Sequence, residues 1–297
     1  MKEFAEVNEQ LYLKWNKHLV DLEKSGIVPA LENNNHPRSK RALKAVQGCS
    51  SKTRLKHYPR KVGPDLASID RTEYCKNNIV CPFCPTRRQW IKSKQFAGKF
   101  HELIKHDKSL NVSFITLSPK NYRTASDGLE KVGKLRSIVH RKCNKSATEF
   151  NKIVGGVTAV DVAYSKDKTN KWNIHLHIVA LHHGELDQSE MVKTWKLITK
   201  DGSYHVDIKP VDKTKTVENK KLNKYTIIGR CEYITKPHKL FANQLVRLNM
   251  VCKNYNFTSS FGFLRGMDTE YYSNKPKDLN EGSCYDITYD ATDGYYR

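Results

Sequence analysis

The sequence predicts an α+β protein built on a central antiparallel sheet, with flanking helices on one side of the sheet. Two observations support this prediction. Short β-branched runs alternate with helical stretches from residue 111 onward, and two of these runs are separated only by a short polar segment. Adjacent strands with a polar turn between them favour antiparallel pairing.

Each element follows from its local pattern. The predicted strands cover residues 111–119, 155–164, 171–181 and 204–211, and the predicted helices cover residues 89–106, 124–152, 186–200 and 223–237. Asp187 or Ser189 caps the helix predicted over residues 186–200. Pro119 ends the first strand and Pro237 stops the last helix, because proline has no amide hydrogen to donate.

The chain divides into four segments by composition. Residues 1–48 are polar and partly helical, residues 49–100 are basic and cysteine-rich, residues 101–265 carry the predicted sheet, and residues 266–297 form an acidic tail. The tail has few apolar residues, so we expect it to be flexible.

The charge of the chain indicates a polyanionic partner, most often nucleic acid. The formal net charge is +21, and the tail holds seven acidic and three basic residues, so residues 1–265 carry +25. No apolar run approaches the length of a membrane span, and the first ten residues do not resemble a signal peptide. We therefore expect a cytoplasmic protein with reduced cysteines and no membrane partner. The motif GxxxxGK[ST] is absent, so no NTP-driven motor is evident.

Two histidines stand in the middle of the apolar run KWNIHLHIVAL. Alternate residues of a strand share a face, so His175 and His177 point the same way. If the polar segment SKDKTNK turns near Lys168, Asp161 lies directly opposite His175 and completes a His-His-Asp set. This set suits Mg²⁺ or Mn²⁺ bridging to phosphate. Zn²⁺ also remains open, and a non-haem iron site has the same ligands, but the charge favours a phosphate substrate.

Tyr233 and Lys236 are three residues apart on the last predicted helix, so both project from one face. A tyrosine beside a lysine and a metal ion could attack a phosphodiester and form a phosphotyrosine. Packing is the more common role of such a pair, and the pattern alone does not separate the two.

The cysteines predict a metal site of another kind. Cys81 and Cys84 form a C-x-x-C half-site, Cys75 is the expected third ligand, and Cys49 or His57 is the fourth. The alternative is a reduced cluster that packs without metal. Arg87 and Arg88 follow directly and are candidates for contact with the DNA backbone.

These motifs together resemble the HUH endonucleases, and more closely the replication initiators of rolling-circle plasmids. The resemblance covers about residues 45–266. It rests on FITLSPKN (114–121), NIHLHIVAL (173–181), Asp161 where the family has glutamate, Trp195 followed by VDIKPV (206–211), Tyr233 with Lys236, FGFLRG (261–266) and the cysteine segment ending in Arg87 and Arg88.

The resemblance implies an RRM- or ferredoxin-like core with the two histidines on its central strand. It implies nicking and rejoining of one strand at a plasmid origin, in single-stranded or hairpin form, with Tyr233 holding the 5′ phosphate and a divalent Mg²⁺ or Mn²⁺ at His175, His177 and Asp161. It also implies structural Zn²⁺ at the four cysteines, and a host helicase and polymerase as partners.

Two departures leave alternatives open. Asn173 stands where the family has its first histidine, and Gly229 stands where its closest members have a glutamate that ends replication. Glu232 lies about 100° around the helix from Tyr233, and Tyr225 lies roughly 80° away, so neither replaces the missing residue directly. The alternatives are an origin-binding protein with a degenerate nuclease site, a related single-tyrosine transposase or mobilisation nuclease, and a metal-only phosphodiesterase.

Overall fold

The computed structural model describes residues 2–58, 66–145, 147–165, 171–203, 205–213, 225–267, 285–290 and 295–296. The chain forms two compact units. One comprises residues 1–86, 241–250 and 274–297, and the other comprises residues 87–240 and 251–273. Residues 49–86 therefore share a unit with residues 1–48, whereas the expected segments divided the chain at residues 48 and 100.

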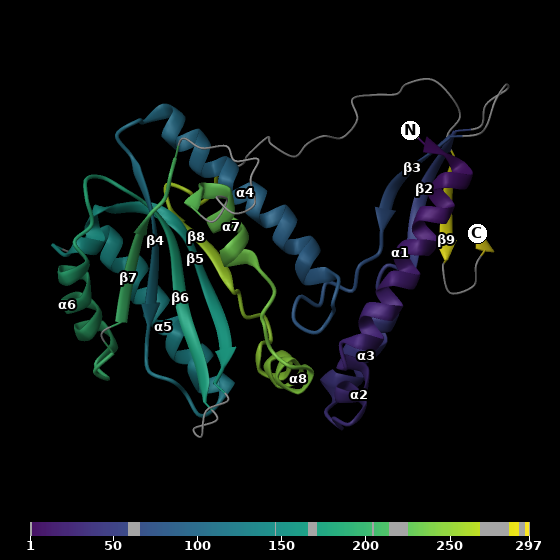
Figure 1. Cartoon of the computed structure of the whole chain (residues 1–297), viewed down its shortest axis with the longest axis horizontal. Helices are drawn as coiled ribbons and strands as arrows, with labels where there is room; N and C mark the ends of the chain where they lie inside the picture. Colours follow the sequence, from purple (N-terminus) through teal and green to yellow (C-terminus); the bar gives the residue numbers. More distant parts are fainter. Residues whose placement is uncertain are drawn as a thin grey trace. The chain divides into compact units, whose positions relative to one another are not determined.

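The second unit is built on a five-stranded antiparallel sheet in the order β7-β4-β6-β5-β8 (Figure 1). Its strands are β4 (Asn111–Ser118), β5 (Ile153–Tyr164), β6 (Trp172–His182), β7 (His205–Pro210) and β8 (Thr258–Gly262). The histidine strand β6 occupies the centre. Helix α5 (Ala125–Lys145) connects β4 to β5, and α6 (Gln188–Thr199) connects β6 to β7, which gives the β-α-β-β-α-β order of ferredoxin-like folds. The predicted α+β class and central antiparallel sheet are confirmed.

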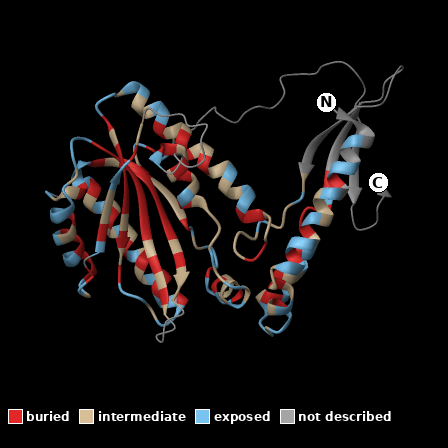
Figure 2. Ribbon diagram, in the orientation of Figure 1, coloured by how far each residue is buried: buried red, intermediate tan, exposed pale blue. Residues whose placement is uncertain are grey.

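Helices cover both faces of this sheet, which corrects the expectation of helices on one side (Figure 1). Helix α5 packs on β5 and β6 from one face. Helices α4 (Cys84–His106) and α7 (Ile227–Thr235) pack on the other, where Phe96, Phe100 and Ile227 form a core with Phe114 and Val179 of the sheet. Because both faces of the sheet are covered, β6 is buried along most of its length, as Figure 2 shows.

The ends of these elements follow local chemistry. Asp187 caps α6 by accepting hydrogen bonds from the amides of Ser189 and Glu190. Thr226 caps α7 by accepting from the amide of Gly229, and α7 ends two residues before Pro237. The short helix η1 (Glu149–Lys152) leads into β5. The centre of the turn between β5 and β6, residues 166–170, lies outside the described residues.

The first unit contains helices α1 (Phe4–Lys24), α2 (Ile27–Glu32), α3 (Pro37–Gln47) and α8 (Ala242–Val251). Its sheet has the order β1-β3-β2-β9-β10 and comprises β1 (Lys2–Glu3), β2 (Lys52–Tyr58), β3 (Leu66–Thr72), β9 (Tyr285–Asp290) and β10 (Tyr295–Tyr296). Leu22, Leu31, Val46 and Val246 form its core together with buried cysteines. Its three amino-terminal helices, α1 to α3, account for most of the described residues between 2 and 48.

The acidic tail is only partly described. Residues 285–290 form β9, which pairs with β2, and residues 295–296 form β10. The remaining tail residues beyond 267, for which flexibility was expected, lie outside the described residues. In the part of the chain that the structure describes, no helix combines the length and apolarity needed to cross a membrane.

Candidate functional site

The two histidines of β6 share the face of the sheet that α7 covers. His177 is 5% exposed, whereas Leu176 and Ile178 are fully buried on the opposite face. Both rings are held by hydroxyl groups of β4: Nδ1 of His175 lies 2.7 Å from Oγ of Ser118, and Nδ1 of His177 lies 3.1 Å from Oγ1 of Thr116. Because Nδ1 is occupied, Nε2 is the free ligand atom of each ring.

Asp161 lies directly opposite His175 in the β5–β6 ladder, which is the register predicted from the sequence. Its Oδ2 is 3.5 Å from Nε2 of His177 and 2.9 Å from Nζ of Lys236. Burial by itself would raise the pKa of Asp161, but the neighbouring His177 and Lys236 outweigh it and hold that pKa well below its usual range. Asp161 is therefore a carboxylate at neutral pH.

Tyr233 lies on α7, and Lys236 is the C-cap residue of this helix. Lys236 forms the ion pair with the Asp161 carboxylate. The Tyr233 ring meets the His177 ring edge-on, with centroids 5.4 Å apart, and Nζ of Lys236 lies 3.8 Å from the Tyr233 centroid. Tyr233 is still 40% exposed, so its phenol is accessible. Burial opposes the charge on Lys236, but the Asp161 carboxylate overcomes this effect and raises the pKa of Lys236. The structure thus brings together all five residues that the sequence singled out here.

Two further groups at this face were missed by the sequence analysis. Nδ1 of His238 lies 4.0 Å from Oδ1 of Asp161, and its ring packs on Phe257. The guanidinium of Arg230 lies 4.5 Å from the Phe114 ring, beside Tyr233. Nδ1 of His238 and Nε of Arg230 are buried without a hydrogen-bond partner among the described residues. The only sequence signal was their closeness to Tyr233 in GRCEYITKPHK.

His175, His177 and Asp161 are the ligand types that divalent cations use, but their ligand atoms do not all lie within 4.8 Å of one another, as those of the four cysteines do. Nε2 of His177 is buried and has no hydrogen-bond partner among the described residues. Burial lowers the pKa of His175 to about 4, so its imidazole is neutral and can donate a lone pair. The two imidazoles are well separated, with ring centroids 6.1 Å apart. One oxygen of Asp161 is already paired with Lys236.

The positions that depart from the family pattern are also placed. Asn173 pairs with Ala163, near the end of the β5–β6 ladder. Gly229 is buried in the first turn of α7, where its amide donates to Thr226. Glu232 follows along α7, with its carbonyl oxygen accepting from Gln89, and Tyr225 precedes the helix and is 49% exposed.

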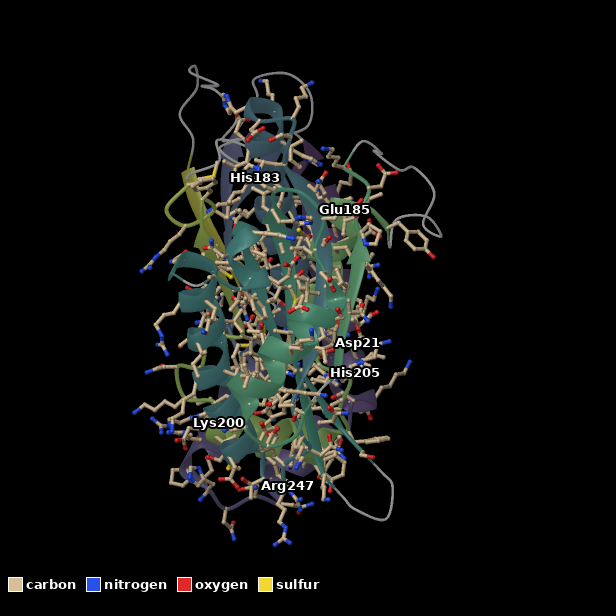
Figure 3. All side chains as sticks on the ribbon, turned by 90° about the vertical axis from the view of Figure 1, so that its left-hand side faces the viewer. Asp21, His183, Glu185, Lys200, His205 and Arg247 are labelled. Carbon is tan, nitrogen blue, oxygen red and sulfur yellow. The ribbon has the colours of Figure 1, made fainter. Side chains whose placement is uncertain are left out.

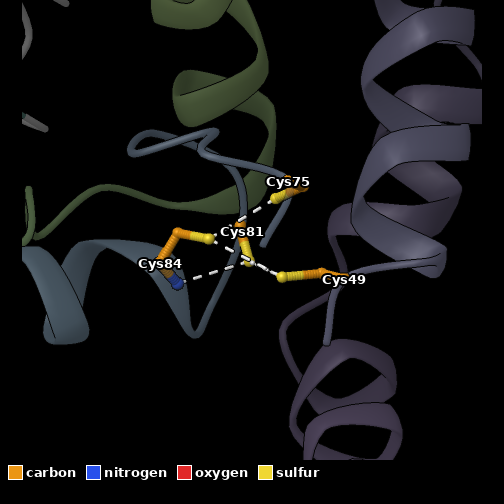
Figure 4. Close-up of side chains that lie close together, drawn as sticks. All are labelled: Cys49, Cys75, Cys81 and Cys84. Carbon is orange, nitrogen blue, oxygen red and sulfur yellow. Dashed lines mark hydrogen bonds between the residues drawn. The ribbon is translucent and has the colours of Figure 1, made fainter. Parts of the chain in front are cut away.

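The four predicted cysteines converge in the first unit (Figure 4). The sulfurs of Cys49 and Cys84, of Cys75 and Cys84, and of Cys49 and Cys81 are each 3.6 Å apart. Sulfurs placed tetrahedrally about 2.3 Å from zinc would be about 3.8 Å apart. Contact with the Cys75 thiol lowers the pKa of Cys49, which favours a thiolate there. The cluster could hold a metal ion, with Cys49 as the fourth member; the side chain of His57 lies outside the described residues.

The two arginines after the cysteines differ in exposure. Arg87 is exposed, whereas Arg88 is half-buried and donates to Oγ1 of Thr258 on β8, 3.4 Å away. On the far edge of the sheet, His205 begins β7 (Figure 3), and its charge would disfavour protonation of His175. Nitrogen-bearing side chains from β6, β7 and α4 therefore lie on the face of the sheet that carries Asp161.

Comparison with known proteins identifies one family. A family model described as a replication protein matches residues 67–282 of the chain. No curated protein and no solved structure matches. The matched range contains the sheet, Asp161, both histidines, Tyr233 and three of the four cysteines.

Proposed function

The chain belongs to the replication protein family of rolling-circle plasmid initiators, and we propose that it nicks and rejoins one origin strand through Tyr233. The observation that supports this proposal is the contact set around Asp161. A strand carboxylate, two strand imidazoles and a lysine–tyrosine pair that contacts them lie on one face of the sheet. Origin DNA, in single-stranded or hairpin form, is the proposed substrate.

The chemical roles follow from the placement of each side chain. The phenol oxygen of Tyr233 forms a bond to the scissile phosphorus and the bond from phosphorus to O3′ breaks, so the 5′ phosphate stays on the tyrosine. The phenol proton is exchanged through water, and the leaving 3′ oxygen ends as a hydroxyl. Lys236, a cation beside the ring, favours the phenolate and the charge on the phosphate. Reversal of these steps rejoins the strand.

His175, His177 and Asp161 are the residues that would hold a divalent Mg²⁺ or Mn²⁺. Such an ion supplies Lewis-acid polarisation of the scissile phosphate. Ser118 and Thr116 orient the two imidazoles for this role, and Lys236 fixes the carboxylate. The free 3′ hydroxyl would prime a host polymerase, and a host helicase would open the duplex.

Substitution of the nucleophile tests the proposal. Wild-type protein incubated with Mn²⁺ and a supercoiled plasmid that carries the cognate origin should give nicked DNA and a covalent protein–DNA adduct. Tyr233→Phe should abolish both, because the new side chain has no oxygen to attack phosphorus. Tyr225→Phe is the matched control and should retain both, since Tyr225 lies outside the helix.

The products also separate the alternatives. An adduct that persists in Tyr233→Phe contradicts the nucleophile assignment. Nicking without an adduct in the wild type would indicate a metal-only phosphodiesterase. Origin binding without any cleavage would indicate a DNA-binding protein with a degenerate nuclease site. A transposase or mobilisation nuclease would instead cleave transposon ends or a transfer origin by the same chemistry.

We propose further that the four cysteines bind structural Zn²⁺. Three sulfur–sulfur distances match a tetrahedral thiolate site, and the cluster is mostly buried within the core of the first unit. Its role is to hold that unit together, apart from the chemistry at Tyr233.

A further inference from the structure

A polar cavity lies in the second unit, outside the contact set around Asp161. It has a volume of about 630 Å³ and lies between α4 and β8. Four of its lining side chains are cationic: Arg88, Lys92, Lys99 and Arg265. None of the described side chains that line it is acidic, and three consecutive residues of β8, 258–260, complete one wall.

The helix spacing explains how the cations gather. Arg88, Lys92 and Lys99 recur at intervals of four and seven residues, so they share one face of α4. Arg88 donates to Thr258, and Nζ of Lys99 donates to the carbonyl oxygen of Leu264, 3.4 Å away. These neutral acceptors orient the cations without neutralising them.

The electrostatic cost of this arrangement points to an anionic ligand. Burial lowers the pKa of Lys92, and the charges of Arg88 and Lys99 lower it further. Like charges held together in a partly buried cavity repel one another, and a polyanion would remove that repulsion. Arg88 shows the same effect of burial on its pKa.

One wall of the cavity lies on the face of the sheet that carries the candidate site. Thr258 pairs with Ala159, which is two residues before Asp161 and therefore on the same face of β5. Phe257 packs against His238, with ring centroids 4.7 Å apart, and His238 adjoins Asp161. A chain of contacts thus joins Asp161 to the wall of the cavity.

We propose that this four-cation cavity binds the phosphodiester backbone of the DNA that extends from the strand held at Tyr233. The proposal rests on the proposed function for the identity of the polyanion. Lys92 and Lys99 each neutralise a backbone phosphate, Arg88 and Arg265 offer planar donors to others, and the hydroxyl groups of β8 accept or donate alongside. Such contacts carry no sequence information, so the cavity positions the DNA and does not select it.

The salt dependence of DNA binding tests this role. In a Tyr233→Phe background, which removes covalent chemistry, the double variant Lys92→Gln/Lys99→Gln should bind DNA with a shallower dependence on salt. Loss of two phosphate contacts lowers the slope of log K against log salt by about 1.4 for a single strand and about 1.8 for a duplex. Fluorescence anisotropy of a labelled oligonucleotide, as a single strand and as its duplex, measures both slopes.

The control variant has the same net charge as the test variant. Lys105→Gln/Lys108→Gln removes two exposed lysines, one in the last turn of α4 and one two residues beyond its end. Neither lines the cavity, so this variant should leave both slopes unchanged. A slope change with one form of DNA identifies that form as the ligand. Unchanged slopes for both forms, with circular dichroism showing a folded variant, would overturn the proposal. The adduct assay with Tyr233→Phe fails or succeeds independently of these slopes.

Discussion

The ion pair of Asp161 and Lys236 is the residue-scale contact that joins sheet and helix at the candidate site. Asp161 was predictable because the number of residues on each side of a turn fixes which residues face one another. Tyr233 and Lys236 were singled out from helical spacing and from resemblance, but α7 ends at Thr235 and Lys236 is its non-helical C-cap with ψ of 152°, so the prediction that both lie on the helix was wrong for Lys236. The 2.9 Å contact between the two groups was not, because it depends on how α7 lies on the sheet. His238 was missed for the same reason: no local period connects it to Asp161.

Ser118 gives a prediction at this scale. Its hydroxyl holds Nδ1 of His175 at 2.7 Å, so Ser118→Ala should free the ring and lower affinity for Mn²⁺ by about 10- to 100-fold. Isothermal titration with Mn²⁺ in the absence of DNA measures the change. Ser137→Ala, an exposed serine of α5, should bind Mn²⁺ as the wild type does. Equal affinities for Ser118→Ala and the wild type would show that the hydroxyl does not orient a ligand.

Helices and strands with a clear apolar periodicity in the sequence were predicted, and those without one were missed. The apolar runs of β4, β5 and β6 and the periodic helices α4, α5 and α6 appear close to their expected positions. Strand β8 was missed because TSSFG is short and polar, and β2 was missed because KTRLKHY has no apolar alternation. The expectation of helices on one side was wrong although β6 carried the contrary signal: its residues 178–181, IVAL, are apolar on both faces of the strand.

Gly262, at the end of β8, gives a prediction at the scale of an element. Its φ is +57°, and a Cβ atom there would lie 2.2 Å from the carbonyl oxygen of Val154. Gly262→Ala should therefore destabilise the sheet by about 3 kcal/mol or more, from backbone strain and steric overlap together. Urea unfolding followed by the fluorescence of the buried Trp172 and Trp195 measures the loss.

Gly266 is the matched control for this substitution. Its φ is +77°, but a Cβ atom there meets nothing within 4 Å. Gly266→Ala should lower the free energy of unfolding by about 1 kcal/mol, because alanine is disfavoured in the left-handed backbone conformation. If the two alanine variants unfold at the same urea concentration, close packing of β8 against β5 is not what requires glycine.

At the scale of the whole molecule, the cysteine cluster joins distant parts of one unit. Cys49 follows α3, whereas Cys84 begins α4, and both lie in the core that α8 completes through Val246. The spacing of Cys75, Cys81 and Cys84 predicted a metal site, but the sequence left the choice between Cys49 and His57 open. Only the fold of the first unit brings the Cys49 sulfur to the other three.

Removal of zinc should unfold the first unit selectively. Binding of structural zinc supplies roughly 10–16 kcal/mol in small zinc domains, so Cys49→Ser should lose bound zinc and protection in that unit. Elemental analysis measures the zinc content, and hydrogen exchange should show faster exchange in residues 1–58 with residues 111–118 and 172–182 unchanged. Cys252→Ser, outside the cluster, should keep one zinc per chain. Full zinc content in Cys49→Ser would contradict the proposed ligand set.

The pairing of β9 with β2 has a consequence for synthesis of the chain. Residues 285–290 supply the neighbour of a strand made from residues 52–58, and the second unit is encoded almost entirely between them. During translation the sheet of the second unit can therefore be complete while β2 still presents an unpaired edge to solvent. Such an edge invites pairing with other chains. A ribosome that stalls before residue 285 would release a polypeptide able to fold the sheet of the second unit and prone to associate through the sheet of the first.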